Sequence, residues 1–286
     1  MSAGAFPARS GSRGVAAHLG ELIAYRHLVA NLVLRDLKVR YKGSVLGVIW
    51  SLASPLLMMV VFWLVFGYFM PSAVPRFHVF VLVAILPWNW FSIAVSGGLR
   101  SIVNNAALIN KVYFPRAALP ISMVVSEMVN FLLAMPVLFV ILYLSGLPPT
   151  VHALWLPVII VVQLLFTLGV VLVLATANVF YRDTGMIMDV LLLAWFFLTP
   201  IIYDIAAYRN TVLPILGISA ERFMYIVNPM ASLVSSYRVV LYGSAEGPPG
   251  DPALNFLFRT AATAVVVLAV GLAVFFRASG RFGEEV

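Results

Sequence analysis

The side chains best suited to do chemistry in this sequence are Glu127 and Asn130, which lie one helical turn apart within a long apolar run. An ionisable group in such a run is costly, so it is by default a candidate for a functional role. A carboxylate and an amide at this spacing would serve equally well in a structural hydrogen bond to a neighbouring helix. Gln163, in another apolar run, has the same two interpretations, and both stay open for all three residues.

The sequence motifs of covalent catalysis and of metal binding are absent. Without a G-x-x-x-x-G-K-[ST] loop the chain has no Walker-type nucleotide site, and without G-x-S-x-G it has no nucleophile elbow. His18, His27, His78 and His152 are too dispersed to form a metal site, and no H-E-x-x-H pair occurs. The lack of cysteine excludes disulfides and thiolate metal sites. We therefore expect no enzyme activity, no bound metal and no cofactor in this chain.

The composition indicates that the chain is surrounded by lipid. Of its 286 residues, 63% are hydrophobic and 10% charged, against roughly 45–50% and about 25% in a soluble domain. A water-soluble fold of this length would be unable to bury so much apolar surface. The net charge of +7 does not indicate nucleic acid as a partner, because the basic residues cluster at the ends of apolar runs, where they act as topology signals.

Six apolar runs are long enough for membrane-spanning helices, which need about 20 residues each. They cover residues 45–70, 78–99, 117–145, 153–180, 186–203 and 255–276, and the fifth is the shortest. Residues 1–20 have no continuous apolar core and predict a flexible tail rather than a cleaved signal peptide. Residues 204–254 are too broken by glycine and proline for another span. The predicted fold is an all-α integral membrane protein with six transmembrane helices, forming one domain over residues 21–286.

The lysine and arginine residues predict the orientation of the chain. With the N-terminus inside, the inner segments hold thirteen of them and the outer segments four, while Arg259 lies near a span boundary. The four outer residues are Arg76, Arg209, Arg222 and Arg238. By the positive-inside rule, both termini are expected in the cytosol and the protein in the plasma membrane.

Residues 22–42 predict an amphipathic helix in the cytosolic membrane interface. At about 100° per residue, its polar side collects His27, Asn31, Arg35, Lys38 and Lys42, and its apolar side collects Leu22, Tyr25, Val29, Leu32, Val33 and Leu37. The apolar side would face acyl chains and the basic side lipid phosphates. Asp36 and Arg40 fall on the apolar side, spaced as a mutual ion pair would be. Either that pair reaches water or it faces another protein helix.

The segment from residue 100 to residue 120 predicts a docking surface. It carries five apolar side chains within a short loop, namely Leu108, Ile109, Val112, Tyr113 and Phe114. Lys111 and Arg116 lie beside them, and exposed apolar residues between charges are typical of a surface that binds another protein. The alternative is an amphipathic segment that dips into the membrane.

Six motifs resemble, in order and in spacing, those of type 2 ABC exporter permeases. They read LRDLKVRYKGSVLGVIWSLASPLL, LPWNWF, LINKVYFPRAALP, NVFYRDTGMI, LTPIIYD and the pair NPM and YRVVLYG. The similarity extends over roughly residues 20–286. It is closest to the polysaccharide branch, whose members export O-antigen, capsule or teichoic acid.

The resemblance implies a homodimer with two separate ABC ATPase subunits, which bind Mg-ATP, and export of an undecaprenyl-linked polysaccharide. The residues that match the family's ATPase-coupling segment are Asn110, Lys111, Val112, Phe114, Pro115 and Arg116, directly after Leu108 and Ile109. Those that match its outer region, where two short helices dip back into the membrane, are Pro200, Tyr203, Asn228 and Pro229. The N-terminal tail and the GSAEGPPGD loop are longer than in the family, so the resemblance does not identify the polymer.

Aromatic side chains in or beside the spans are candidates for a sugar path, because aromatic faces stack on the CH faces of sugar rings. The candidates are Trp50, Trp63, Tyr68, Trp195, Phe196 and Phe197. For Trp88 and Trp90, near a span's outer end, we expect an interfacial aromatic belt instead.

We therefore expect an export permease for a lipid-linked polysaccharide. Within the same family, the alternative is a permease for a drug or a small lipid. A membrane-embedded lipid-modifying transferase would need a cluster of carboxylates or histidines, which the sequence lacks. A secondary transporter would show two similar halves with broken helices at matching positions, and no internal repeat is found.

Overall fold

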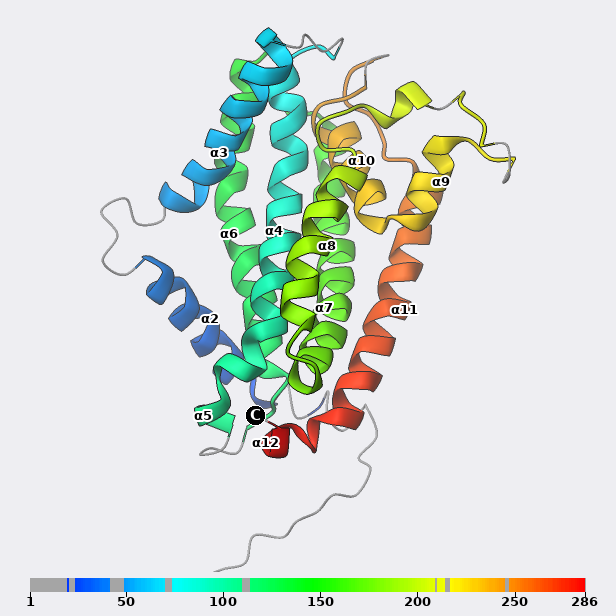
Figure 1. The fold of residues 1–286 in the computed structure, drawn as a ribbon. Coiled ribbons are helices and arrows are strands. Elements are labelled where there is room, and N and C mark those ends of the chain that lie inside the picture. Colours follow the sequence, from blue (N-terminus) through cyan, green and yellow to red (C-terminus); the bar gives the residue numbers. More distant parts are fainter. Residues whose placement is uncertain are drawn as a thin grey trace, which may run out of the picture.

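The computed structural model describes residues 20, 24–41, 49–69, 74–109, 114–208, 210–213, 217–244 and 247–285. Most of these residues are helical (Figure 1). The longer helices are α2 (Arg26–Tyr41), α3 (Ile49–Trp63), α4 (Phe77–Asn104), α6 (Ala118–Leu144), α7 (Leu156–Phe180), α8 (Thr184–Leu198), α10 (Pro229–Leu241) and α11 (Leu254–Ser279). The short ones are η1 (Leu64–Phe69), α5 (Ala106–Ile109), η2 (Val151–Trp155), η3 (Ile205–Tyr208), α9 (Ala220–Val227) and α12 (Phe282–Glu285).

The long helices run side by side, and the short helices gather at the two ends of the bundle (Figure 1). One end carries α2, α5, α12 and the C-terminus, and we refer to it as the terminal end. The opposite end carries α9 and α10, and we refer to it as the α9–α10 end.

Helix α4 forms the centre of the bundle. It contacts α3, α6, α7, α8 and α10, and most of its side chains are buried. Its aromatic residues pack against other helices, with the ring centroid of Phe91 5.8 Å from that of Phe166 on α7. The second predicted span is therefore surrounded largely by protein.

Four of the described helical segments are long and apolar enough to cross a membrane. They are α4, α6, α11 and the segment Val151–Phe180 that η2 and α7 form together. These coincide with the second, third, fourth and sixth predicted spans. An all-α integral membrane protein is thus confirmed, and the chain passes through the membrane several times.

The first and fifth predicted spans correspond to shorter apolar helices, Leu56–Phe66 and Thr184–Leu198. Helix α8 ends at Leu198, not at residue 203 as predicted. The residue before Pro200 is Thr199, whose φ of −93° and ψ of 132° are extended. Proline disfavours the helical conformation for its predecessor, which accounts for the early end.

Helices α7 and α11 approach each other closely because both carry glycine at their contact. A Cβ atom on Gly169 would lie 2.6 Å from the backbone nitrogen of Leu268. One on Gly271 would collide with the backbone of Gly169. Small residues let backbones meet in membrane bundles, where close packing replaces the hydrophobic effect between helices.

Candidate functional site

Arg238 on α10 joins three separate parts of the chain at the α9–α10 end. Its guanidinium donates hydrogen bonds to the carbonyl oxygens of Phe80 (3.3 Å), Ile201 (2.6 Å) and Pro200. It also lies over the Phe80 ring, 3.4 Å from the ring centroid. Only 6% of the residue is exposed. A buried cation without such partners would destabilise the fold. The three carbonyl groups and the Phe80 ring therefore determine where the Arg238 guanidinium lies.

Asn228 makes a second junction at the same end. Its side-chain oxygen caps α10 by accepting from the backbone of Met230 and Ala231, the usual role of asparagine before a helix. The same oxygen accepts from the Trp195 indole at 2.8 Å. Its amide nitrogen donates to the Thr199 hydroxyl at 3.0 Å and to the Leu198 carbonyl at 3.3 Å. One side chain therefore ties the end of α8 to the start of α10.

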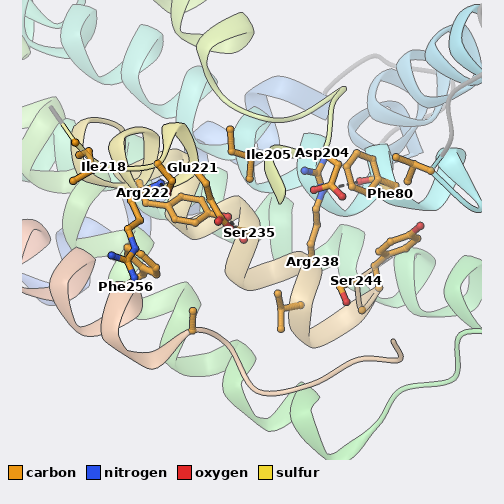
Figure 2. A pocket seen from close by; sticks show the side chains of 18 residues that line it. Phe80, Asp204, Ile205, Ile218, Glu221, Arg222, Ser235, Arg238, Ser244 and Phe256 are labelled. Atoms are coloured by element: carbon orange, nitrogen blue, oxygen red, sulfur yellow. Dashed lines mark hydrogen bonds between the residues drawn. The ribbon is translucent and has the colours of Figure 1, made fainter. Parts of the chain in front are cut away.

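A cavity of about 520 Å³ lies beside Arg238 at this end (Figure 2). Its walls come from α9, α10, the start of α11 and the turn at residues 204–205. The volume falls within the roughly 300–1,000 Å³ typical of ligand sites. Charged, hydroxyl and aromatic side chains all line it, as Figure 2 shows for Glu221, Ser235 and Phe256.

The outer-region residues selected from the sequence lie around these two junctions. The carbonyl of Pro200 binds Arg238, and Pro229 is the first residue of α10. The Tyr203 hydroxyl lies 3.4 Å from the carbonyl oxygens of Phe197 and Leu198.

The importance of Arg238 was missed because it was counted among four basic residues of outer segments. The structure shows that this side chain is buried among other segments of the fold. A signal was available, because Arg238 is the one charged residue in the run from Pro229 to Leu241.

At the terminal end, a separate apolar cluster holds the short elements together. Phe282 on α12 is fully buried, with its ring centroid 5.2 Å from that of Phe275 and 6.1 Å from that of Phe180. The other buried members are Leu32, Ile102, Ile109, Ala117, Ala118, Leu119, Leu172, Ala175 and Val179. Phe282 was also missed, because the C-terminal tail reads as polar apart from this aromatic residue.

The predicted coupling segment packs on the edge of this cluster. Ile109 is 9% exposed, so the expectation that it projects from the surface is corrected. Leu108 and Phe114 are half-buried against the same cluster. Arg116 donates a hydrogen bond to the carbonyl of Ser279, and Pro115 is half-buried beside it. Asn110, Lys111, Val112 and Tyr113 lie outside the described residues.

Helix α2, the predicted interface helix, packs against α6. Leu32 and Val33 on its apolar side are 6% and 8% exposed, so this side faces protein where we expected acyl chains. The cause is the terminal cluster, which Leu32 joins. Lys38 on the basic side is exposed, in agreement with the predicted separation of faces.

Asp36 forms an ion pair with Arg35 at 2.9 Å, and the predicted i,i+4 pair with Arg40 stays a prediction. The side chain of Arg40 and all of Lys42 lie outside the described residues. Asp36 also lines a small cavity together with Arg100 and Ser122, which favours the interpretation that it faces other helices.

Arg100 forms a further link that the sequence did not reveal. Its guanidinium binds the Asp189 carboxylate at 2.6 Å and the Gly185 carbonyl at 3.3 Å. It therefore connects α4 to α8. Its two partners, Gly185 and Asp189, lie 85 and 89 residues further along the chain.

The candidate channel aromatics divide into two groups. Trp195 and Phe196 are half-buried against the main core, whereas Trp63, Tyr68 and Phe197 are 48%, 75% and 57% exposed. The side chain of Trp50 lies outside the described residues.

The belt predicted for Trp88 and Trp90 is wrong. They are only 4% and 2% exposed, and the Trp90 ring stacks on Phe131 with a centroid distance of 5.1 Å. Both lie on α4, the central helix, so protein surrounds them where lipid headgroups were expected.

The polar residues at membrane depth are engaged within the bundle. Asn130 donates to the Glu127 carboxylate at 3.2 Å, and both are buried. Gln163 donates to the Pro87 carbonyl at 2.8 Å and thereby links α7 to α4. These hydrogen bonds support structural roles for the three residues. Across the part of the chain that the structure describes, no group of three potential metal ligands occurs.

Comparison with known proteins gives consistent matches. The ABC-2 type transporter family matches residues 27–242. An O-antigen export system permease protein RfbA from Myxococcus xanthus is 38% identical over 266 residues, which is 93% of this chain and 98% of the relative. Two proteins of the same name from Klebsiella pneumoniae are 33% and 32% identical over 270 residues, covering 93% of this chain and 96% of each relative.

Proposed function

This chain belongs to the ABC-2 type transporter family, and we propose that it is the permease subunit that exports an O-antigen-like, lipid-linked polysaccharide. The observation that carries the proposal is the similarity to three O-antigen export permeases over 93% of this chain. A transport permease has no need of catalytic residues, which accords with the absence of nucleotide-binding and catalytic motifs from the sequence.

In the proposed orientation the protein lies in the plasma membrane, with its terminal end facing the cytosol and its α9–α10 end facing outward. The excess of lysine and arginine in the predicted inner segments supports this orientation. With α3 and α8 counted as spans, the chain crosses the membrane six times. In this arrangement α9 and α10 are the short helices that dip back from the outer side.

The proposed assembly is a homodimer with two ATPase subunits that bind Mg-ATP. The apolar surfaces of α3 and α8 are the proposed contact between copies, because Trp63 and Phe197 are largely exposed there. The two helices meet through Phe62 and Phe196, whose ring centroids are 6.1 Å apart. The undecaprenyl-linked glycan would pass along these surfaces and the adjoining η1, with Trp63, Tyr68 and Phe197 as its aromatic contacts.

The segment 100–116 is the proposed receiver of ATPase motion. It starts at Arg100, which holds α8, and ends at Arg116, which holds the last turn of α11. A force applied between these residues reaches two helices at once.

A complementation experiment tests the proposed function. A bacterial strain that lacks its O-antigen export permease and accumulates lipid-linked glycan inside is given this chain with its ATPase. Surface glycan, measured with intact cells, is expected to return with the active ATPase and to stay absent with an ATPase that cannot hydrolyse ATP. Restored secretion of a drug or small lipid without surface glycan would favour the other branch of the family.

A further inference from the structure

The described lining of the cavity at the α9–α10 end carries charges of both signs. Its lining includes the acidic residues Asp204 and Glu221 and the basic residues Arg222 and Arg238. Arg238 is already bound to three carbonyl groups and is stacked on Phe80, so it acts as a wall of the cavity. The described lining thus offers charged groups of both signs and no surface of a single sign, which suits an uncharged polar ligand.

Hydrogen-bonding groups face the cavity from several directions. The Tyr225 hydroxyl lies 2.9 Å from the Ser235 hydroxyl, and both residues line it. Burial raises the pKa of Tyr225 to about 12, with Glu221 adding to the shift, so the phenol stays protonated. Hydroxyl and carboxylate groups together supply donors and acceptors for a ligand rich in hydroxyl groups.

An aromatic surface completes the lining. The ring of Phe256, at the start of α11, meets the ring of Tyr225 edge to face at a centroid distance of 5.0 Å. Phe80 is covered by the Arg238 guanidinium, whereas the Tyr225–Phe256 pair and Tyr242 are further aromatic side chains in the cavity lining. Figure 2 labels Phe256, Arg222 and Glu221 among the side chains that line the cavity, so charged and aromatic groups both contribute to it.

We propose that this cavity binds a neutral sugar unit of the exported glycan on the outer side of the membrane. The inference rests on the proposed export function, and it adds a glycan-binding site away from the exposed aromatic surface of α3 and α8. Sugar hydroxyl groups bind Glu221 and the Tyr225–Ser235 pair, while a CH face of the ring packs on Phe256. A site of this kind retains the emerging chain and disfavours its return.

Photo-cross-linking in exporting cells tests the proposal without knowledge of the sugar. A photoreactive benzoylphenylalanine replaces Phe256 in one variant and Phe258 in the matched control. Phe258 lies two residues further along α11, is 66% exposed and is absent from the cavity lining. After illumination, the permease is purified and stained for attached glycan. We expect a ladder of glycan adducts from position 256 and none from position 258.

A second variant, Glu221→Gln, removes one charged acceptor and keeps the shape of the side chain. Its adduct yield at position 256 is expected to fall about tenfold, the loss expected when a hydrogen bond to a charged group is removed. Glu284→Gln, an exposed glutamate at the terminal end, is the control and should leave the yield unchanged.

The failures of the two proposals differ. Surface glycan at the wild-type level with no adduct at position 256 would overturn the outer site and leave the export function standing. Absence of surface glycan with the unmodified chain and its ATPase would overturn the export function. The Phe256 replacement could itself stop export while the unmodified chain exports normally. The photoreactive group then replaces Arg222, which lines the same cavity. Adducts at that position would support the outer site, and surface glycan without adducts would overturn it.

Discussion

At the α9–α10 end a single guanidinium holds three chain segments together, whereas at the terminal end the same task falls to aliphatic and aromatic side chains. Arg238 binds carbonyl groups of residues 80, 200 and 201 through directional contacts. Phe282 and Ile109 are held by apolar packing, with Leu108 and Phe114 half-buried at the margin.

The difference separates a rigid region from an adaptable one. Buried hydrogen bonds to a cation require one geometry, and losing one leaves an unpaired polar group. Apolar contacts have no required direction, and half-exposed ones can be extended by another protein. The α9–α10 end therefore suits a fixed cavity wall, and the terminal end suits docking and movement.

The largest effect is expected from Arg238→Ala. Three carbonyl acceptors lose their donor, and the side-chain stem leaves a void, so we expect a loss of about 4 kcal/mol in stability. Surface glycan should fall in parallel. Thermal unfolding in detergent measures the change, with Arg259→Ala as the control, since Arg259 is exposed and its guanidinium donates to the Ile226 carbonyl at 3.3 Å. Equal stability of the two variants would show that the α9–α10 end is not fixed by Arg238.

Next in size is Phe282→Ala at the terminal end. A fully buried aromatic ring is removed, and such truncations cost about 3 kcal/mol or more. Because the cluster supports α12 and the segment near Phe114, ATPase binding should weaken as well. The exposed Phe258→Ala is the matched control for thermal unfolding. If Phe282→Ala unfolds at the same temperature as the control, the apolar cluster does not hold the terminal end together.

Phe114→Ala tests the docking surface itself. Truncation of an aromatic side chain that is docked on a partner costs about 2 kcal/mol or more of binding free energy. The Phe114 ring is only half-buried in the permease itself, so it contributes less to folding stability. Co-purification of the ATPase should therefore drop while permease yield stays unchanged. Arg182→Ala, in the exposed turn before α8, is the comparison and should retain the ATPase. Full assembly of the Phe114 variant, with cross-links to the ATPase only at residues 181–185, would relocate the contact.

The smallest effect is expected from Asn228→Ala. The helix cap and the bond to Trp195 are lost, at a cost of about 1–2 kcal/mol. Asn228→Ser retains a capping oxygen and should recover part of the loss in thermal unfolding. If both variants unfold at the wild-type temperature, the junction between α8 and α10 is maintained by other contacts.

The long elements were predictable from the sequence because each is a continuous apolar run. The helices α4, α6, α7 and α11 follow directly from that pattern. The inward position of Arg238 was not predictable in the same way, since its acceptors lie 37, 38 and 158 residues away. Burial of Trp88 depends on which helix occupies the centre of the bundle, and local sequence does not specify that.

The ends of the helices and the neighbours they pack against were predicted less well than the helices themselves. Helix α8 ends earlier than its hydrophobicity suggests because of the single residue Pro200. Leu32 and Val33 gave the correct apolar side of α2 but the wrong neighbour, because an apolar side is equally suited to lipid and to another helix. The sequence thus gives the face of a helix, and tertiary packing selects what covers it.

Transport by purified components tests the central claim most directly. The chain is reconstituted in liposomes that contain lipid-linked glycan, with or without its ATPase, and glycan enclosed in the lumen is measured after addition of Mg-ATP outside. The account predicts uptake with both proteins, none with the permease alone, and no ATP hydrolysis by the permease alone. Glycan uptake or ATP hydrolysis by the permease without its ATPase would contradict the account.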